Sequence, residues 1–87
     1  MKITKTFYPK NRKAWRKWLE KHHAVKDEIW LIYPQKASGR PCLNYVHAVQ
    51  EALCFGWIDS TVRKYDAQSR AQRWTPRRKG SQWSEVN

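Results

Sequence analysis

The stretch at residues 44–59, NYVHAVQEALCFGWID, decides the fold of this chain, because it encodes a capped helix, a forced stop and a strand. The Asn44 side chain can accept a backbone N–H of the first turn, so it predicts the start of a helix. Gly56 stands where a helix can finish in a left-handed conformation, which costs glycine little. Trp57 and Ile58 then predict an extended segment that presents Asp59 between apolar neighbours.

Helical spacing predicts an apolar stripe on one side of this central helix. The stripe contains Tyr45, Val49, Ala52, Leu53 and Gly56, and leaves His47, Gln50 and Glu51 outside it. We therefore expect the first set to face the core. Cys54 is interpreted as a buried structural thiol, because the dipole at a helix C-terminus disfavours a reactive thiolate.

Two elements are predicted before this stretch. Asn11 can cap a helix that runs to about His22, with an apolar face made of Trp15, Trp18, Leu19 and His22. Residues 29–33, IWLIY, are a continuous apolar run typical of a strand buried on both faces, and at Pro34 the strand should end or face an edge. Residues 1–10 are interpreted as a lead-in that packs on the domain.

After Asp59 the second strand continues to Tyr65, and a polar connector leads into a third, exposed strand at residues 70–75. Ser81 can cap a last short helical turn, with Ser84 as the competing cap. The order helix–strand–helix–strand–strand predicts an α+β fold in a single domain over residues 1–87. We expect a small antiparallel or mixed sheet of about three strands, packed against two main helices.

The composition and charge of the chain limit which classes of protein are possible. The 87 residues include six Trp, four Tyr and two Phe, which can supply the large core side chains that a small domain needs. The net charge of +11 is concentrated at the two ends of the chain and favours anionic partners: nucleic acid, phosphate or carboxylate ligands, or anionic lipid. The alternative is a solvated surface that only maintains solubility. With two cysteines, no signal sequence and no membrane-spanning run, we expect a cytoplasmic protein without a disulfide framework.

Candidate chemistry is sparse. The histidines and cysteines match no zinc spacing, so neither a metal nor a cofactor is predicted. Asp59 has two interpretations that the sequence leaves open: it lines a pocket with Trp57 and orients a ligand, or it accepts a charge-assisted bond from the Arg77-Arg78 turn. A role for Asp59 as a general acid or base has no partner beyond a distant His47. An enzyme is therefore the least favoured class.

The segment at residues 73–84, RWTPRRKGSQWS, interleaves guanidinium groups with indole rings. Arginine pairs with phosphate and indole offers a stacking face, so the pattern favours anions. It matches no nucleic-acid-binding signature.

Together with the central stretch, these residues resemble the YdeI/OmpD-associated (bacteriocin-protection) proteins of bacteria. The matching pieces, in the family's order, are WRKWL at 15–19, IWL at 29–31, YVHA at 45–48, ALCFGWID at 52–59, TPRR at 75–78, and SQWS at 81–84 with Asn87. Pro34-Gln35 replace the family's lysine-rich strand end, and the family's C-terminal helical region is missing, so we expect a short or truncated member. The resemblance implies a link to bacterial envelope stress and to resistance against bacteriocins or cationic antimicrobial peptides, with no established reaction.

The leading hypothesis is a non-enzymatic binding module with a polar-aromatic pocket for a small anionic ligand or an acidic protein segment. The residues expected to meet there are Trp57, Asp59, Thr75, Arg77, Arg78, Ser81, Trp83, Ser84 and Asn87. The alternative is a nucleic-acid-binding protein that uses a basic helix face and the basic C-terminal tail. That face consists of Arg12, Lys13, Arg16, Lys17 and Lys21. Because a protein of charge +11 repels cationic peptides, any protection against them is expected to be indirect.

Overall fold

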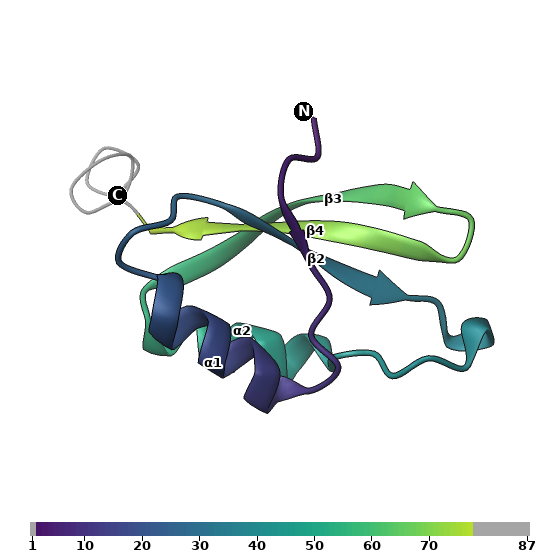
Figure 1. The fold of residues 1–87 in the computed structure, drawn as a ribbon, viewed down its shortest axis with the longest axis horizontal. Coiled ribbons are helices and arrows are strands. Elements are labelled where there is room, and N and C mark those ends of the chain that lie inside the picture. Colours follow the sequence, from purple (N-terminus) through teal and green to yellow (C-terminus); the bar gives the residue numbers. More distant parts are fainter. Residues whose placement is uncertain (1, 78–87) are drawn as a thin grey trace, which may run out of the picture.

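The computed structural model describes residues 2–77 and has the predicted α+β class, with two α-helices and a four-stranded mixed sheet (Figure 1). In chain order the elements are β1 (Thr6–Phe7), α1 (Arg12–His22), β2 (Ile29–Pro34), a 3-10 turn η1 (Lys36–Ser38), α2 (Tyr45–Cys54), β3 (Trp57–Asp66) and β4 (Ser69–Pro76).

The strand order is β1-β2-β4-β3, with β1 parallel to β2 and the other neighbours antiparallel. The sequence predicts about three strands, and the additional one is β1, which lies in the segment interpreted as a lead-in. Its two residues are too few to show a period-two pattern, and only their pairing with Trp30 and Leu31 makes them a strand.

β4 corrects one expectation, because it is a central strand and not an exposed one. It lies between β2 and β3, and Trp74 is fully buried. The polar residues that suggested exposure have partners within the sheet: Gln72 donates to Asp59, and Arg73 pairs with Glu28. These partners make a polar pattern compatible with a central strand, although the buried Oε1 atom of Gln72 has no hydrogen-bond partner.

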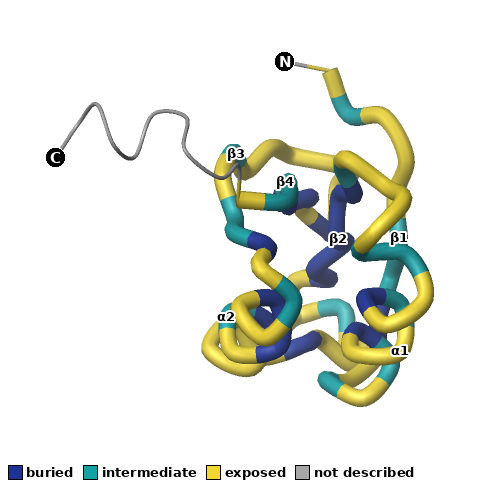
Figure 2. The backbone as a smooth tube through the Cα atoms, turned by 90° about the vertical axis from the view of Figure 1, so that its left-hand side faces the viewer, coloured by how far each residue is buried: buried dark blue, intermediate teal, exposed yellow. Residues whose placement is uncertain are grey.

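The two helices lie together on one face of the sheet, as Figure 2 shows edge-on. Their core contains Trp15, Trp57 and Trp74, and the ring centroids of Trp15 and Trp74 are 5.7 Å apart. On the other face, Trp30, Ile32 and Ala71 are covered by Ile3 and Tyr8. The N-terminal segment therefore closes the side of the sheet that has no helix.

The predicted helix signals are confirmed. The Oδ1 atom of Asn11 accepts the N–H of Ala14 at 2.9 Å, and that of Asn44 accepts the N–H of His47 at 3.2 Å. Gly56 has a φ of 73°, the left-handed conformation expected where the chain turns from α2 into β3. Every residue of β2 is buried, as the apolar run predicts.

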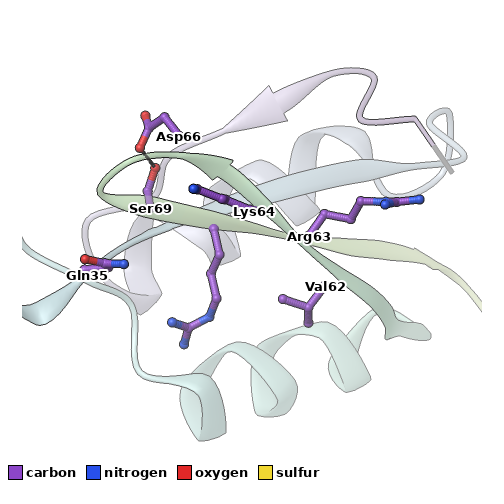
Figure 3. A pocket seen from close by; sticks show the side chains of 7 residues that line it. Gln35, Val62, Arg63, Lys64, Asp66 and Ser69 are labelled. Atoms are coloured by element: carbon purple, nitrogen blue, oxygen red, sulfur yellow. Dashed lines mark hydrogen bonds between the residues drawn. The ribbon is translucent and has the colours of Figure 1, made fainter.

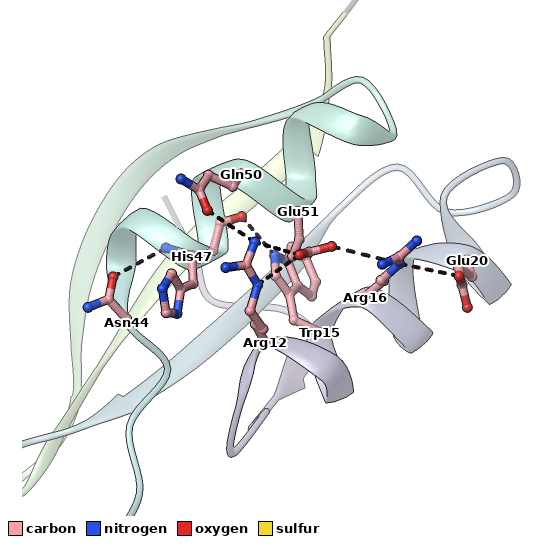
Figure 4. Close-up of polar contacts among 9 residues, drawn as sticks. Arg12, Trp15, Arg16, Glu20, Asn44, His47, Gln50 and Glu51 are labelled. Carbon is pink, nitrogen blue, oxygen red and sulfur yellow. Dashed lines mark hydrogen bonds and ion pairs between the residues drawn. The ribbon is translucent and has the colours of Figure 1, made fainter.

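The predicted apolar stripe of α2 is only partly confirmed: Ala52 is buried and Val49 packs against the core, but the other members are exposed. Tyr45 and Leu53 are 51% and 57% exposed, whereas Ala48, Glu51 and Ala52 face inward. The inward face contains a carboxylate because Arg12 of α1 neutralises it: Arg12 Nε donates to Glu51 Oε2 at 2.8 Å (Figure 4). Hydropathy alone assigns glutamate to solvent. Cys54, predicted to be buried, is exposed.

Candidate anion-binding groove

The predicted site residues in the described part of the chain separate into different environments. Trp57 is 1% exposed, and its Nε1 donates to the carbonyl of His23 at 3.3 Å, so it belongs to the core. Thr75 lies opposite Ile58 in the β3–β4 ladder. Arg77 is exposed, donates its backbone N–H to the carbonyl of Gly56 at 2.7 Å, and makes a further interaction.

Asp59 is held by two neutral donors. Its Oδ2 accepts the hydroxyl of Tyr45 at 2.7 Å and the Nε2 of Gln72 at 2.9 Å. The bond to Asp59 raises the pKa of Tyr45, so this hydroxyl stays protonated at neutral pH. Both interpretations of Asp59 from the sequence stay predictions, because Arg78 of the proposed turn lies outside the described residues. The remaining predicted site residues (Arg78, Ser81, Trp83, Ser84 and Asn87), with the helical turn expected after Ser81, lie outside the described residues.

Two adjoining hollows lie at the other end of the sheet, where the β3–β4 hairpin faces the connector from β2 to α2. The first encloses about 310 Å³ and is lined by Gln35, Val62, Arg63, Lys64, Asp66, Ser69 and Arg70. The second encloses about 530 Å³ and is lined by Pro34, Lys36, Gly39, Arg40, Cys42, Leu43, Asn44 and Arg70. Because Arg70 lines both hollows, we treat them as one feature, the basic groove. In Figure 3, Gln35 of the connector and Val62 of β3 lie on opposite sides of the first hollow.

The strand ladder positions the cations of the hairpin. Lys64 of β3 pairs directly with Arg70 of β4, and Tyr33 of β2 lies opposite Arg70 on its other side. The Arg70 guanidinium carbon is 5.8 Å from the centroid of the Tyr33 ring, a cation–π distance that orients the side chain. The β3–β4 register shifts at Asp59/Val62 and at Lys64/Asp66, and such irregularities bend and twist a hairpin.

The connector is fixed by its own hydrogen bonds. The Gln35 N–H donates to the carbonyl of Gln68 at 2.7 Å, which ties the connector to the hairpin turn. Ser38 Oγ donates to the Gln35 carbonyl at 2.7 Å and accepts the Arg40 N–H at 3.2 Å. The Arg40 guanidinium carbon lies 5.9 Å from the Tyr8 ring centroid. These bonds order the backbone of the connector that carries Lys36 and Arg40.

The basic groove carries an uncompensated positive charge. Its cations are Lys36, Arg40, Arg63, Lys64 and Arg70, and its lining contains one carboxylate, Asp66. The Asp66 Oδ1 accepts bonds from Ser69 Oγ and the Gln68 N–H, which hold the pKa of this carboxyl below its usual range. Within residues 2–77 the ion pairs involve other arginines, with Glu28, Glu20 and Glu51 as the acids.

The basic face predicted on α1 is partly used inside the fold. Arg12 pairs with Glu51 at 2.7 Å, whereas Arg16 pairs with Glu20 at 3.5 Å on the surface and stays exposed together with Lys13, Lys17 and Lys21. Sequence reasoning missed the groove, because its cations come from three separate segments. The available signal was the position of Arg63, Lys64 and Arg70 on both arms of a hairpin, which becomes informative only once the register is known.

A family profile described as a domain of unknown function, DUF8412, matches residues 7–87. The chain belongs to this family. No curated protein and no solved structure matches the chain significantly. Within residues 2–77, neither helix is long and apolar enough to cross a membrane. The same residues hold no cluster of three or more histidine, cysteine or acidic side chains that could bind a metal ion.

Proposed function

We propose that this DUF8412 domain is a non-enzymatic binding module for phosphate-bearing anions, and that its site is the basic groove. The proposal keeps the anion-binding function expected from the sequence and moves the site away from Trp57, which packs in the core. The cations of the groove are supplied by Lys36, Arg40, Arg63, Lys64 and Arg70.

One observation carries the proposal: Lys64 and Arg70 are direct cross-strand neighbours, and no ion pair within residues 2–77 neutralises either one. Like charges directly opposite each other destabilise an antiparallel pair, with cross-strand pair terms of roughly 0.2–1 kcal/mol. The arrangement thus costs folding stability. An anion bound between the two side chains would replace this repulsion with attraction to both. Stability that is given up at a site is expected when the site serves binding.

Two further contacts support binding over solubility as the role of these charges. The aromatic rings of Tyr33 and Tyr8 lie against the guanidinium groups of Arg70 and Arg40, which limits their rotamer freedom before an anion arrives. Guanidinium groups also suit phosphate, because they donate two parallel hydrogen bonds. A charge needed only for solubility requires neither a hollow nor a fixed orientation.

The test is a titration of inorganic phosphate, pyrophosphate and tripolyphosphate, followed by isothermal calorimetry at low and physiological salt. The variants are Arg70→Gln and, as a control of equal charge change, Lys26→Gln, which lies in the connection between α1 and β2. A charge-assisted bond contributes about 1.5–3 kcal/mol, so Arg70→Gln should weaken binding about 10- to 100-fold and Lys26→Gln much less. Equal weakening in both variants contradicts a defined site.

The resemblance to the YdeI/OmpD-associated family stays a prediction. If it holds, an anion-binding module fits an indirect part in bacterial envelope stress, because the groove has the same sign of charge as a cationic peptide. Survival of a deletion strain under bacteriocin challenge, complemented by wild type or by Arg70→Gln, tests that link. If both complement equally, the groove has no part in protection.

A further inference from the structure

The two hollows of the basic groove share one residue and differ in all the others. Arg70 lines both, while Arg63 and Lys64 belong to the first hollow and Lys36 and Arg40 to the second. Each hollow therefore offers cations of its own on either side of a shared guanidinium. A single compact anion would occupy one hollow, whereas a polymer with regularly spaced anionic groups can occupy both.

The position and shape of the groove indicate which kind of anionic polymer can bind there. It is a concave feature between the hairpin and the connector, which are tied together by the bond from Gln35 to Gln68. A double helix presents its phosphates on a convex surface and is far wider than hollows of about 310 and 530 Å³. A single strand can enter with its backbone along the cations, as in other single-strand binding grooves.

A half-exposed tyrosine is the chain neighbour of a lining residue of each hollow. Tyr65 is 46% exposed and lies between Lys64 and Asp66, at the second register shift of β3. Tyr45 is 51% exposed and directly follows Asn44 of the second hollow. Cations that follow a backbone, with aromatic rings beside them, are the usual composition of a surface that binds single-stranded nucleic acid.

We propose that the basic groove binds single-stranded nucleic acid, with successive phosphates on the two sides of Arg70 and bases stacked on Tyr65 and Tyr45. This inference rests on the proposed function and specifies its ligand class. The contribution of stacking, about 1–3 kcal/mol per base, distinguishes a nucleic acid from any other chain of phosphates.

The experiment measures fluorescence anisotropy with labelled ten-nucleotide oligothymidylate. Unlabelled single strand, a duplex of the same length, inorganic polyphosphate and inorganic phosphate are used as competitors. We expect the single strand to compete better than polyphosphate of equal charge, and better than the duplex. Because single strands give a salt slope of about −0.7 per phosphate neutralised, four contacts predict a slope of about −3. Arg70→Gln should reduce the magnitude of this salt slope by about 0.7.

The decisive variant is Tyr65→Ala, with Tyr65→Phe as the control that keeps the ring. Tyr65→Ala should weaken oligothymidylate binding about 5- to 100-fold, leave polyphosphate binding unchanged, and be rescued by Tyr65→Phe. If polyphosphate binds as tightly as the single strand and Tyr65→Ala changes neither, the ligand is a general polyanion; this inference then fails and the proposed function stands. Preference for the duplex also overturns it. If labelled oligothymidylate does not bind even at low salt, this inference fails, and the calorimetric titration of phosphate, pyrophosphate and tripolyphosphate decides the proposed function separately.

Discussion

Lys64 and Arg70 lie directly opposite each other in the β3–β4 ladder. Asp66, the one carboxylate among the described residues that line the basic groove, is already bonded to Ser69 and Gln68. Under the proposed function, substitutions of this pair should change stability and binding in opposite directions, which is unusual for a buried or purely structural site. Most residues that hold a fold together weaken it when they are replaced. The groove can therefore be tested by variants that leave the domain folded.

Lys64→Gln is expected to stabilise the domain. Removing one of two facing cations relieves their repulsion, so the free energy of unfolding should rise by about 0.2–1 kcal/mol. Urea denaturation followed by tryptophan fluorescence measures the change, and Lys26→Gln controls for the loss of one charge. A fall in the unfolding free energy of Lys64→Gln would show that this lysine has a stabilising partner.

Glu51→Gln should destabilise the packing of α1 on α2. The Glu51 side chain is 10% exposed and accepts from Arg12, so the neutral amide leaves the guanidinium without its charged partner. We expect a loss of about 1–3 kcal/mol in chemical denaturation. A double-mutant cycle with Arg12→Gln isolates the pair, and Glu20→Gln provides a control on an exposed ion pair. Additive losses in the cycle would mean that the pair contributes nothing.

Glu28 predicts a pH dependence of stability. Its carboxylate accepts bonds from Thr4 and Arg73, and these hold the pKa of Glu28 below its usual value. A lowered pKa in the folded state adds stability above the unfolded pKa, about 4.3, and this stability is lost as the pH falls through the folded value. The stability difference between wild type and Glu28→Gln should therefore be largest near pH 7 and shrink below about pH 4. A difference that stays constant from pH 7 to pH 3 would contradict this assignment.

Gly56→Ala should destabilise the turn from α2 into β3. A Cβ at this position meets no atom within 4 Å, so the penalty comes from the backbone φ of +73° alone. The left-handed conformation costs an L-residue about 1–2 kcal/mol, and asparagine tolerates it better. The midpoint temperature of thermal unfolding should consequently be highest for the wild type, lower for Gly56→Asn and lowest for Gly56→Ala. Equal stability of the two substitutions would indicate that the turn adopts another conformation.

Local signals made much of the fold predictable. Asn11, Asn44 and Gly56 act within one helical turn of their own position, and β2 is a continuous apolar run, so no long-range information was needed. The inward position of Glu51 depends on an arginine that is 39 residues earlier in the chain. The core position of Trp74 depends on the placing of β4 between two other strands.

The candidate site was less predictable for the same reason. The Arg70 guanidinium becomes part of a site through Tyr33 and Lys64, which belong to two different strands. The predictions for Cys54, Tyr45 and Leu53 were wrong because their exposure depends on which side of α2 packs on α1 and β3. Hydropathy at helical spacing did not fix that rotation, since α2 carries apolar residues on more than one side.

The most direct test of the basic groove is a charge reversal that compares Lys64→Glu with Lys26→Glu. Affinity for tripolyphosphate is measured by calorimetry, and the urea midpoint is measured on the same samples. We expect Lys64→Glu to lose at least about tenfold in affinity while its urea midpoint rises, because the new carboxylate pairs with Arg70. Lys26→Glu should show a smaller loss of affinity. Equal losses in the two variants, or a lowered midpoint for Lys64→Glu, would contradict a binding site built on the Lys64–Arg70 pair.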